Sequence, residues 1–468
     1  MEYVIGIVLL LTFFGLAWYC IKGHNLMIGF LMISVVWTVL PLVGTYFVSP
    51  EFLAANPVLI FGGESGNKLV DILNAIYQAA PEGWGTTLVN VCWGAWFGRV
   101  LMETNIASTL IRKTVELGGD KPVITVTLLN VVTALIFTAM TGAGPVIAIG
   151  VIVLPIMMSL GVPKAVAMFS FMGSVAAGIY MNPVNFAQYR AFFIATDEMP
   201  EFTLGWYASH WGYYAMAIML VATTVLAAIY MKKAKTSHAW AAQTRASGRS
   251  NVSEQKDAPI YTLILPIVPV VLKIWLDFSV IGGFIIAGFL ALLLCGKLKS
   301  GFKEGCQLVN KLYYDGVVDT APLIGFLLTL PMFNKVATYA SPYFKAVLGN
   351  IMPKSEIVVC IVFAILLGMG LFRGPMTLVG CGAATLGVLS NVASFSVPFL
   401  YAVFAIPTIT VNIGSCITQS WVAWGLAYTK VESKDFLKLS IPNAYLAGVL
   451  QYVLTFALLT GLGAAWFA

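Results

Sequence analysis

The chain has 468 residues, of which 59% are hydrophobic and only 10% are charged, and its mean hydropathy is +0.89. No soluble domain of this length carries that balance, so the sequence predicts a polytopic, all-α membrane protein. The net charge of +6 requires no nucleic-acid partner, because basic loops set the orientation of membrane proteins.

The first half predicts five membrane spans, at residues 3–21, 25–48, 85–102, 165–194 and 206–230. Residues 3–21 lack a basic leading region and a small-residue cleavage site, so we expect a retained helix there and not a signal peptide. Residues 165–194 are too long for one straight span. We expect a break at Asn182-Pro183, because proline removes a helix donor and clashes with the preceding turn.

A re-entrant hairpin is expected between the third and fourth spans. Its arms are 123–140 and 146–160, and the sequence TGAGP at 141–145 forms its tip. Two full spans are the alternative, because the first arm has spanning length. Lys121 before the element and Lys164 after it favour the same side of the membrane, which supports the hairpin.

The second half follows the same plan. Residues 232–258 form a polar linker with six Lys or Arg residues, predicted to be cytoplasmic. Further spans are expected at 260–276, 279–295, 317–333, 393–428 and 439–462, and a second hairpin at 356–389 with its tip at 372–375. The long span at 393–428 is expected to break near 407–415. We therefore divide the chain into a first inverted repeat (1–231), the linker (232–258) and a second inverted repeat (259–468).

The two halves share one gap-free register with a shift of 230 residues. It relates the following pairs: Ala107-Ser108 and Ala337-Thr338, Gly144-Pro145 and Gly374-Pro375, Gly150 and Gly380, and Asn182 and Asn412. Five crossings per half and the placement of Lys and Arg put the N-terminus outside and invert the second half relative to the first. The first hairpin then enters from the cytoplasm and the second from outside.

Interrupted helices predict where a ligand binds. Lipid cannot satisfy the backbone groups that a break frees, so breaks survive where they line a cavity, and paired breaks in two halves indicate a transporter's site. Helix ends at the tips provide an anion site without side-chain charge, and glycine allows close approach. The candidate substrate and ion ligands are Thr141, Gly142, Gly144, Asn182, Asn185, Arg373, Gly374, Thr377, Thr408, Thr410, Asn412 and Ser415, with Gln188, Thr418 and Gln419 also within reach. Helix–helix hydrogen bonding is the alternative role for each of the polar side chains.

Charged residues inside the spans are few. Arg99 and Glu103 are four residues apart, which favours a structural pair on one helix. Asp319 is the one plausible acidic proton carrier, and a solvated helix start is its alternative. Arg373 lies at the second tip, where we expect it to bind a substrate carboxylate through two parallel hydrogen bonds. The alternative is a shallower tip from which Arg373 snorkels to the outer surface. The first tip has no matching arginine, which favours a hydroxy- or sugar acid over a symmetric dicarboxylate.

Other function classes fit less well. A channel would show continuous pore helices and rings of charge, and a membrane enzyme would need a catalytic cluster, neither of which is visible. No Walker motif is present, so ATP is not the direct driver. The three histidines and seven scattered cysteines predict no metal site.

Within transporters, a sodium/proton antiporter should show an aspartate at a break, and neither break has one. That antiporter and a carrier of a neutral metabolite remain the alternatives to an organic-anion carrier.

The order of elements resembles the ion-transporter superfamily of secondary carriers. The C-type anaerobic C4-dicarboxylate carriers look closest, with gluconate and citrate permeases more distant. The resemblance rests on YCIKGHNLMIGF, the TGAGP tip followed by LPIMMSLGVPKA, and the second-half GLFRGP and NIGSCITQS. It implies a carboxylate bound at two tips and two unwound helices, often beside sodium, and an elevator movement of the site. The Ser-Asn-Thr runs of many relatives are replaced here by TGAG and FRGP, and Asn412 stands where C-type carriers have Ser-Pro.

These arguments predict a secondary transporter of a small organic anion, which is a carboxylate, a hydroxy- or sugar acid, or a C4-dicarboxylate. A sodium or proton gradient is expected to drive it. No cofactor is expected apart from Na⁺ as a possible coupling ion, and the chain is not expected to be an enzyme. The expected setting is a multi-pass homodimer in the bacterial cytoplasmic membrane, with the lipid bilayer as its other partner.

Overall fold

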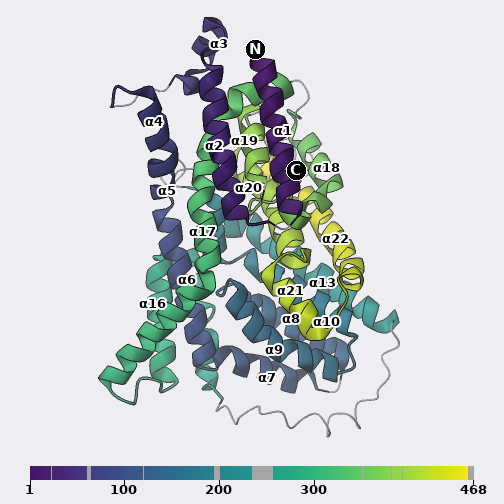
Figure 1. Ribbon diagram of the computed structural model, residues 1–468. Helices are drawn as coiled ribbons and strands as arrows, with labels where there is room; N and C mark the ends of the chain where they lie inside the picture. Colours follow the sequence, from purple (N-terminus) through teal and green to yellow (C-terminus); the bar gives the residue numbers. More distant parts are fainter. Residues whose placement is uncertain are drawn as a thin grey trace.

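The structure is a computed structural model that describes residues 1–22, 24–60, 65–119, 121–193, 201–233, 257–349, 353–380, 382–392 and 394–461. Within these ranges every regular element is a helix (Figure 1), so the predicted all-helical class is confirmed. The basic linker lies outside the described residues apart from its two ends, and the proposed division into repeats stays a prediction.

The first half follows the expected order closely. Its helices are α1 (Glu2–Ile21), α2 (Leu26–Gly44), α3 (Pro50–Ala55), η1 (Pro57–Leu59), α4 (Lys68–Asn74), η2 (Ala75–Ala79), α5 (Ala80–Glu82), α6 (Gly85–Glu103), α7 (Ile106–Gly118), α8 (Pro122–Phe137), α9 (Ala143–Ser159), α10 (Lys164–Ile179), α11 (Pro183–Arg190), α12 (Leu204–Tyr207), η3 (Ala208–Gly212) and α13 (Tyr213–Lys233). The break between α10 and α11 bends the chain by 67° at the predicted Asn182-Pro183 step.

The second half contains one large departure from expectation. Its helices are η4 (Ile260–Ile264), α15 (Val268–Leu276), α16 (Val280–Leu294), α17 (Phe302–Leu348), α18 (Glu356–Ile365), η5 (Leu367–Arg373), α19 (Gly382–Val392), α20 (Val397–Ile406), η6 (Pro407–Ile413), α21 (Ser420–Thr429) and α22 (Ser433–Leu459). We expected a span of 317–333, but α17 is one helix of 47 residues. The apolar run marks where lipid ends and not where the helix ends, because the polar residues that flank it are also good helix formers.

Helix α17 forms the support against which the N-terminal helices and α19 pack. It contacts α1, α2, α6 and α19 along its length, and Figure 1 shows it running from the lower left to the top of the molecule. Helices α8 and α9 lie in the lower part of that view, and α18 and α19 lie in the upper part. The two helix–turn–helix elements are therefore at opposite ends of the molecule, as the opposed-hairpin hypothesis requires.

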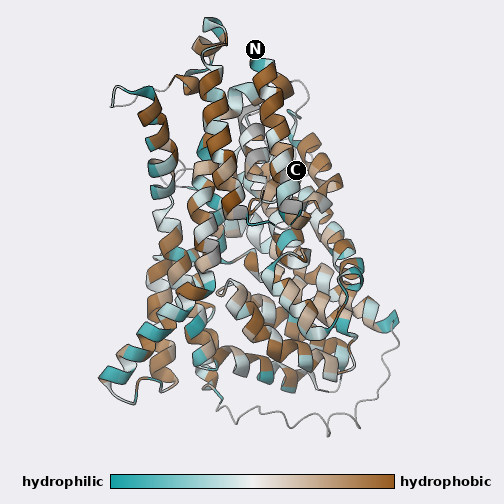
Figure 2. Cartoon of the chain, viewed as in Figure 1, coloured by the Kyte–Doolittle hydropathy of each residue, from teal (hydrophilic) through white to brown (hydrophobic). Residues whose placement is uncertain are grey.

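The outer surface is apolar where lipid is expected. Large hydrophobic side chains are exposed on α1, α2, α13, α16 and α22, and α1 and α2 are largely brown in Figure 2. Three described helical stretches are long and apolar enough to cross a membrane, namely Met27–Gly44, Leu204–Lys233 and Ser433–Leu459, or five if each bent pair counts as one span. Shorter apolar helices make up the remainder, and the ten-span count stays a prediction.

Buried aromatic rings join the elements around the first break. Tyr207 and Tyr401 have ring centroids 5.2 Å apart, and Phe186 lies 5.0 Å from Tyr207 and 5.6 Å from Tyr401. Each such pair adds roughly 0.5–1.5 kcal/mol beyond area burial. The cluster holds α11, α12 and α20 together, and so positions the broken helices of both halves next to each other.

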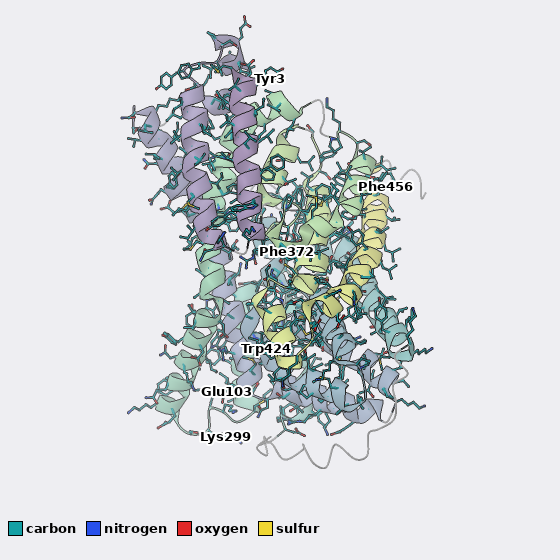
Figure 3. All side chains as sticks on the ribbon, turned by 45° about the vertical axis from the view of Figure 1, so that its right-hand side comes forward. Tyr3, Glu103, Lys299, Phe372, Trp424 and Phe456 are labelled. Carbon is teal, nitrogen blue, oxygen red and sulfur yellow. The ribbon has the colours of Figure 1, made fainter. Side chains whose placement is uncertain are left out.

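The two ends of the molecule differ in charge, which predicts its orientation. Figure 3 shows Lys299 and Glu103 at one end and Tyr3 at the other. In a variant without native cysteines, Ser300→Cys should react with a membrane-impermeant thiol reagent only from the cytoplasm, because Lys297, Lys299 and Lys303 surround it. Glu51→Cys, on α3, should react only from outside. Val151→Cys, exposed on the apolar face of α9, serves as the unreactive control. Labelling of positions 300 and 51 from one side would contradict this arrangement.

Candidate functional site

The interrupted elements of both halves meet around one cavity of about 190 Å³. The cavity is smaller than the roughly 300–1,000 Å³ of drug-sized ligand pockets, so it suits a small metabolite. Its lining comes from the first tip, the first broken helix, the second tip, the second break and α17. The lining residues are Phe137, Thr141, Gly142, Ala143, Val146, Val175, Ile179, Asn185, Gln188, Tyr189, Asp319, Thr320, Arg373, Val379, Ile413, Gln419, Ser420 and Trp421.

The first tip presents a bare helix N-terminus to the cavity. Gly142 has φ +96°, a conformation that favours glycine, and it precedes α9 without a side-chain cap. Gly142, Ala143 and Val146 all line the cavity. The free N–H groups and the dipole of α9 therefore favour a negative charge here. Thr141 is buried and lines the same wall, and its role as a ligand stays a prediction.

Asn182 holds the first break together and does not line the cavity. Its Oδ1 accepts hydrogen bonds from the backbone N–H groups of Val184 (3.0 Å) and Asn185 (3.1 Å), which caps α11. Its Nδ2 donates to the carbonyls of Phe137 and Met140, both at 3.1 Å. The amide thus satisfies backbone groups at the end of α8 and at the start of α11. A role as sodium ligand stays a prediction.

The next turns of α11 do reach the cavity. Asn185, Gln188 and Tyr189 line it, and all three are buried. Asn185 donates from Nδ2 to the Tyr189 hydroxyl at 3.3 Å, while its Oδ1 is a buried acceptor without a hydrogen-bond partner among the described residues. An unsatisfied buried oxygen beside a cavity is a position where a ligand hydroxyl, a water or a cation gains a bond.

The second tip holds an arginine in a strained backbone. Phe372 and Arg373 have φ of +55° and +57°, in the left-handed region that non-glycine residues seldom occupy. Such residues cost roughly 1–3 kcal/mol each and persist where the surroundings enforce them. The Phe372 N–H donates to Cys416 Sγ at 3.1 Å, which ties the tip to the second break. Arg373 lines the cavity and forms no ion pair within the described part of the chain.

The arm after the second tip begins later than expected. The expected tip at 372–375 implies a second arm that starts directly after it, but residues 374–380 form tight turns and α19 begins at Gly382. Gly380 approaches the backbone of Arg373 so closely that an added Cβ would overlap it, and Gly374 is similarly close to Met369. The second tip is therefore a compact loop, and it does not present a helix N-terminus to the cavity as the first does.

The second break is a widened helix that packs behind the second tip. Asn412 donates to the Gly370 carbonyl at 3.4 Å and accepts from the Gln419 side chain. Thr408 accepts from the Leu378 N–H at 2.9 Å. Thr408, Thr410 and Asn412 are fully buried and do not line the cavity, nor do Thr377, Ser415, Gly144 and Gly374. The side chains of Asn182, Thr408, Thr410 and Asn412 form hydrogen bonds within the frame of the site, while the buried Thr377 hydroxyl has no partner among the described residues. A role as ligand stays a prediction for each of them.

The hydrogen bonds repeat the register found in the sequence. Asn182 to Met140 in the first half corresponds to Asn412 to Gly370 in the second, because both residues shift by 230. Tyr180 and Thr410 are also related by this shift, and their hydroxyls bond to each other at 2.7 Å. Equivalent bonds in both halves agree with the predicted register, and the inverted repeat itself stays a prediction.

A second helix N-terminus lies at the end of the second break. Helix α21 starts at Ser420, and Gln419 precedes it without a side-chain cap. Gln419, Ser420 and Trp421 line the cavity. Two uncapped N-termini, of α9 and α21, therefore face the same small space, and both favour an anion.

The charges inside the membrane pair differently from our expectation. The predicted Arg99–Glu103 pair is wrong, because Arg99 donates from Nε and Nη2 to both oxygens of Asp319 at 2.6 Å each, and Glu103 pairs with Lys297 at 2.9 Å. Asp319 lies well inside α17 and lines the cavity, so it is not at a solvated helix start. Because Arg99 and Glu103 are close in sequence, the sequence favoured a pair between them, whereas the partner of Arg99 is Asp319, 220 residues away.

The first tip touches this ion pair. A Cβ added at Gly144 would overlap the Asp319 carboxylate. We expect Gly144→Ala to push the tip or the carboxylate aside and to cost roughly 1–3 kcal/mol of stability, as overpacking does. Thermal unfolding of the purified protein measures this. Gly15→Ala on α1, which meets no atom within 4 Å, is the matched control. Equal unfolding temperatures for both variants would show that the contact is absent.

Comparison with known proteins adds to this picture. Residues 100–304 match the DcuC family model, described as C4-dicarboxylate anaerobic carrier. That segment includes the first tip, the first break and Arg190, but not the second tip. The sequence has no match among curated proteins.

The fold is similar to that of a solved transporter. The crystal structure of the YdaH transporter from Alcanivorax borkumensis, described as having an unusual topology, matches at a TM-score of 0.58 and 13% identity, covering 94% of this chain and 99% of that one. The resemblance predicted from the sequence is confirmed, because more than two-fifths of the chain matches a C4-dicarboxylate carrier model and nearly all of it has the fold of a solved transporter.

Proposed function

We propose that this protein is a secondary transporter that binds a small organic carboxylate in the cavity between its two tips and two breaks. The carrier model matched by residues 100–304 and the transporter fold support this class. The observation that carries the proposal is Arg373, a cation without an ion-pair partner among the described residues, facing a cavity that also receives the N-termini of α9 and α21.

The matched family model favours a C4-dicarboxylate over the hydroxy- or sugar acid that one arginine alone suggests. The carboxylate would take two parallel hydrogen bonds from the guanidinium of Arg373, a geometry that lysine cannot reproduce. The remainder of the substrate would lie against Asn185, Gln188 and Gln419, whose amides can donate to or accept from it.

We propose that the tips and breaks move as one body against α17, in the manner of an elevator. Hydrogen bonds donated by Asn182 and Asn412, and one accepted by Thr408, tie each tip to its break. The face of the first tip that meets α17 consists of Gly142 and Gly144, near Thr320 and Asp319. Side chains interlock less at this face, so sliding of the first tip breaks few contacts there, whereas the same movement also has to shift α19, the arm after the second tip, along α17.

Binding measurements on Arg373 variants test the proposed function. Arg373→Ala should weaken carboxylate binding about 10- to 100-fold, the equivalent of roughly 1.5–3 kcal/mol for a hydrogen bond to a charged group. Arg373→Lys should recover only part of that loss. Calorimetry with fumarate, a hydroxy acid and a sugar acid measures both affinity and preference. Wild-type affinity in both variants would remove Arg373 from the site and reopen the substrate class.

We propose that a sodium or a proton gradient drives transport. The sodium form would use backbone carbonyls and neutral oxygens at the two arm ends that Asn182 and Asn412 hold in place. Asn182→Ala and Asn412→Ala should then reduce the stimulation of proteoliposome uptake by sodium more than they reduce expression. Asn130→Ala is the matched control, because Asn130 is equally buried but bonds Ser170 away from the tips. Uptake that ignores sodium and loses its proton dependence in Asp319→Asn would exclude the sodium form.

A further inference from the structure

We propose that Asp319 is a protonatable counter-ion that masks Arg99, so that the cavity accepts a monoanion without a proton and a dianion only together with one. This inference rests on the proposed function and deepens it. It connects the charge of the substrate with the number of protons bound, and it assigns that link to one carboxylate.

The geometry places Asp319 between the cavity and Arg99. Both oxygens of the carboxylate accept from Arg99, on α6, at 2.6 Å. Asp319 lines the cavity and Arg99 does not, and the side chain of Asp319 is 17% exposed against 31% for Arg99. The cavity therefore meets a neutralised pair. When Asp319 is protonated, the positive charge of Arg99 is left uncompensated beside the cavity.

The charges then determine what can bind. Arg373 and Arg99 are positive and Asp319 is negative, which leaves one positive charge at the site. A monoanion neutralises that charge. A dianion leaves one negative charge in excess in a space of low dielectric, where an uncompensated charge is costly. Adding one proton to Asp319 removes the excess without any change in the position of the substrate.

The surroundings offer no equivalent carboxylate in the described part of the chain. On α17 itself, Asp315 lies one turn earlier and does not line the cavity. On α6, Glu103 is held by Lys297 at 2.9 Å. Across the cavity are Arg373 and the phenol of Tyr189. The other helices packed against α17 near this point, namely α2, α9 and α19, contain no titratable side chain.

The sign of the pH dependence follows directly. A dianion binds together with a proton, so its affinity rises as the pH falls, by up to about tenfold per pH unit for one full proton. A monoanion binds without a proton, so its affinity stays flat over the same range. Effects of pH on folding or on the detergent change the affinities for both ligands equally. The difference between the two pH dependences therefore reports the proton bound with the dianion.

Proton counting by calorimetry tests this on the intact protein. Fumarate and its monoamide have nearly the same shape and differ by one charge, and both keep their charges between about pH 6 and about pH 8. Titrations in two buffers with different ionisation enthalpies give the number of protons taken up. We expect about one proton with fumarate and about none with the monoamide for the wild type.

Variants then locate the proton. Asp319→Asn should bind fumarate without proton uptake and with an affinity that no longer depends on pH. Asp315→Asn, the matched control one turn away, should behave as the wild type. Equal proton counts for the two ligands in the wild type, or proton uptake that persists in Asp319→Asn, would overturn the inference while leaving the transporter proposal in place. A wild type that binds neither fumarate nor its monoamide would overturn the proposed function and this inference with it.

Discussion

The structure depends on how backbone groups freed by helix breaks are satisfied where lipid cannot satisfy them. In each half an asparagine side chain satisfies one of these groups, since Asn182 bonds the carbonyl of Met140 and Asn412 bonds that of Gly370. Each hydrogen bond joins the end of the first arm of a hairpin to the broken helix of the same half. The chain can therefore interrupt two helices within its apolar interior, and the interruptions leave space for a ligand.

The same breaks explain why the site attracts an anion although it contains few charged side chains. The N–H groups at the starts of α9 and α21 have no side-chain cap, and both face the cavity. Arg373 adds one positive charge on a backbone held in an unfavourable conformation. The pair of Arg99 and Asp319 adds a second cation, which we propose is masked until Asp319 takes up a proton. Fixed helix dipoles, one cation without an ion-pair partner among the described residues and one paired cation together make the site polar.

Local patterns predicted the elements well and the contacts between them poorly. The break at Asn182-Pro183 and the bounds of α6 follow from proline chemistry and apolar run length, which are local. The length of α17 could not be predicted, because its ends continue past the apolar run that signals the membrane. The pairing of Arg99 with Asp319 joins residues 220 positions apart, and a nearer acid offered a false partner. The compact second tip arises from backbone-to-backbone approach at Gly374 and Gly380, which no periodicity encodes.

The bond between Tyr180 and Thr410 has a consequence for how such a molecule can arise. Where two identical half-length subunits meet on a twofold axis, each residue on that axis must face its own copy, and a large side chain must accommodate another large one. Once the halves are fused in one polypeptide, the two positions can diverge, and here a phenol meets a small hydroxyl. The cavity beside them shows the same divergence, because Ala143 of one half corresponds to Arg373 of the other. A repeat of the predicted kind thus permits an asymmetric lining, with an arginine at the second tip and none at the first.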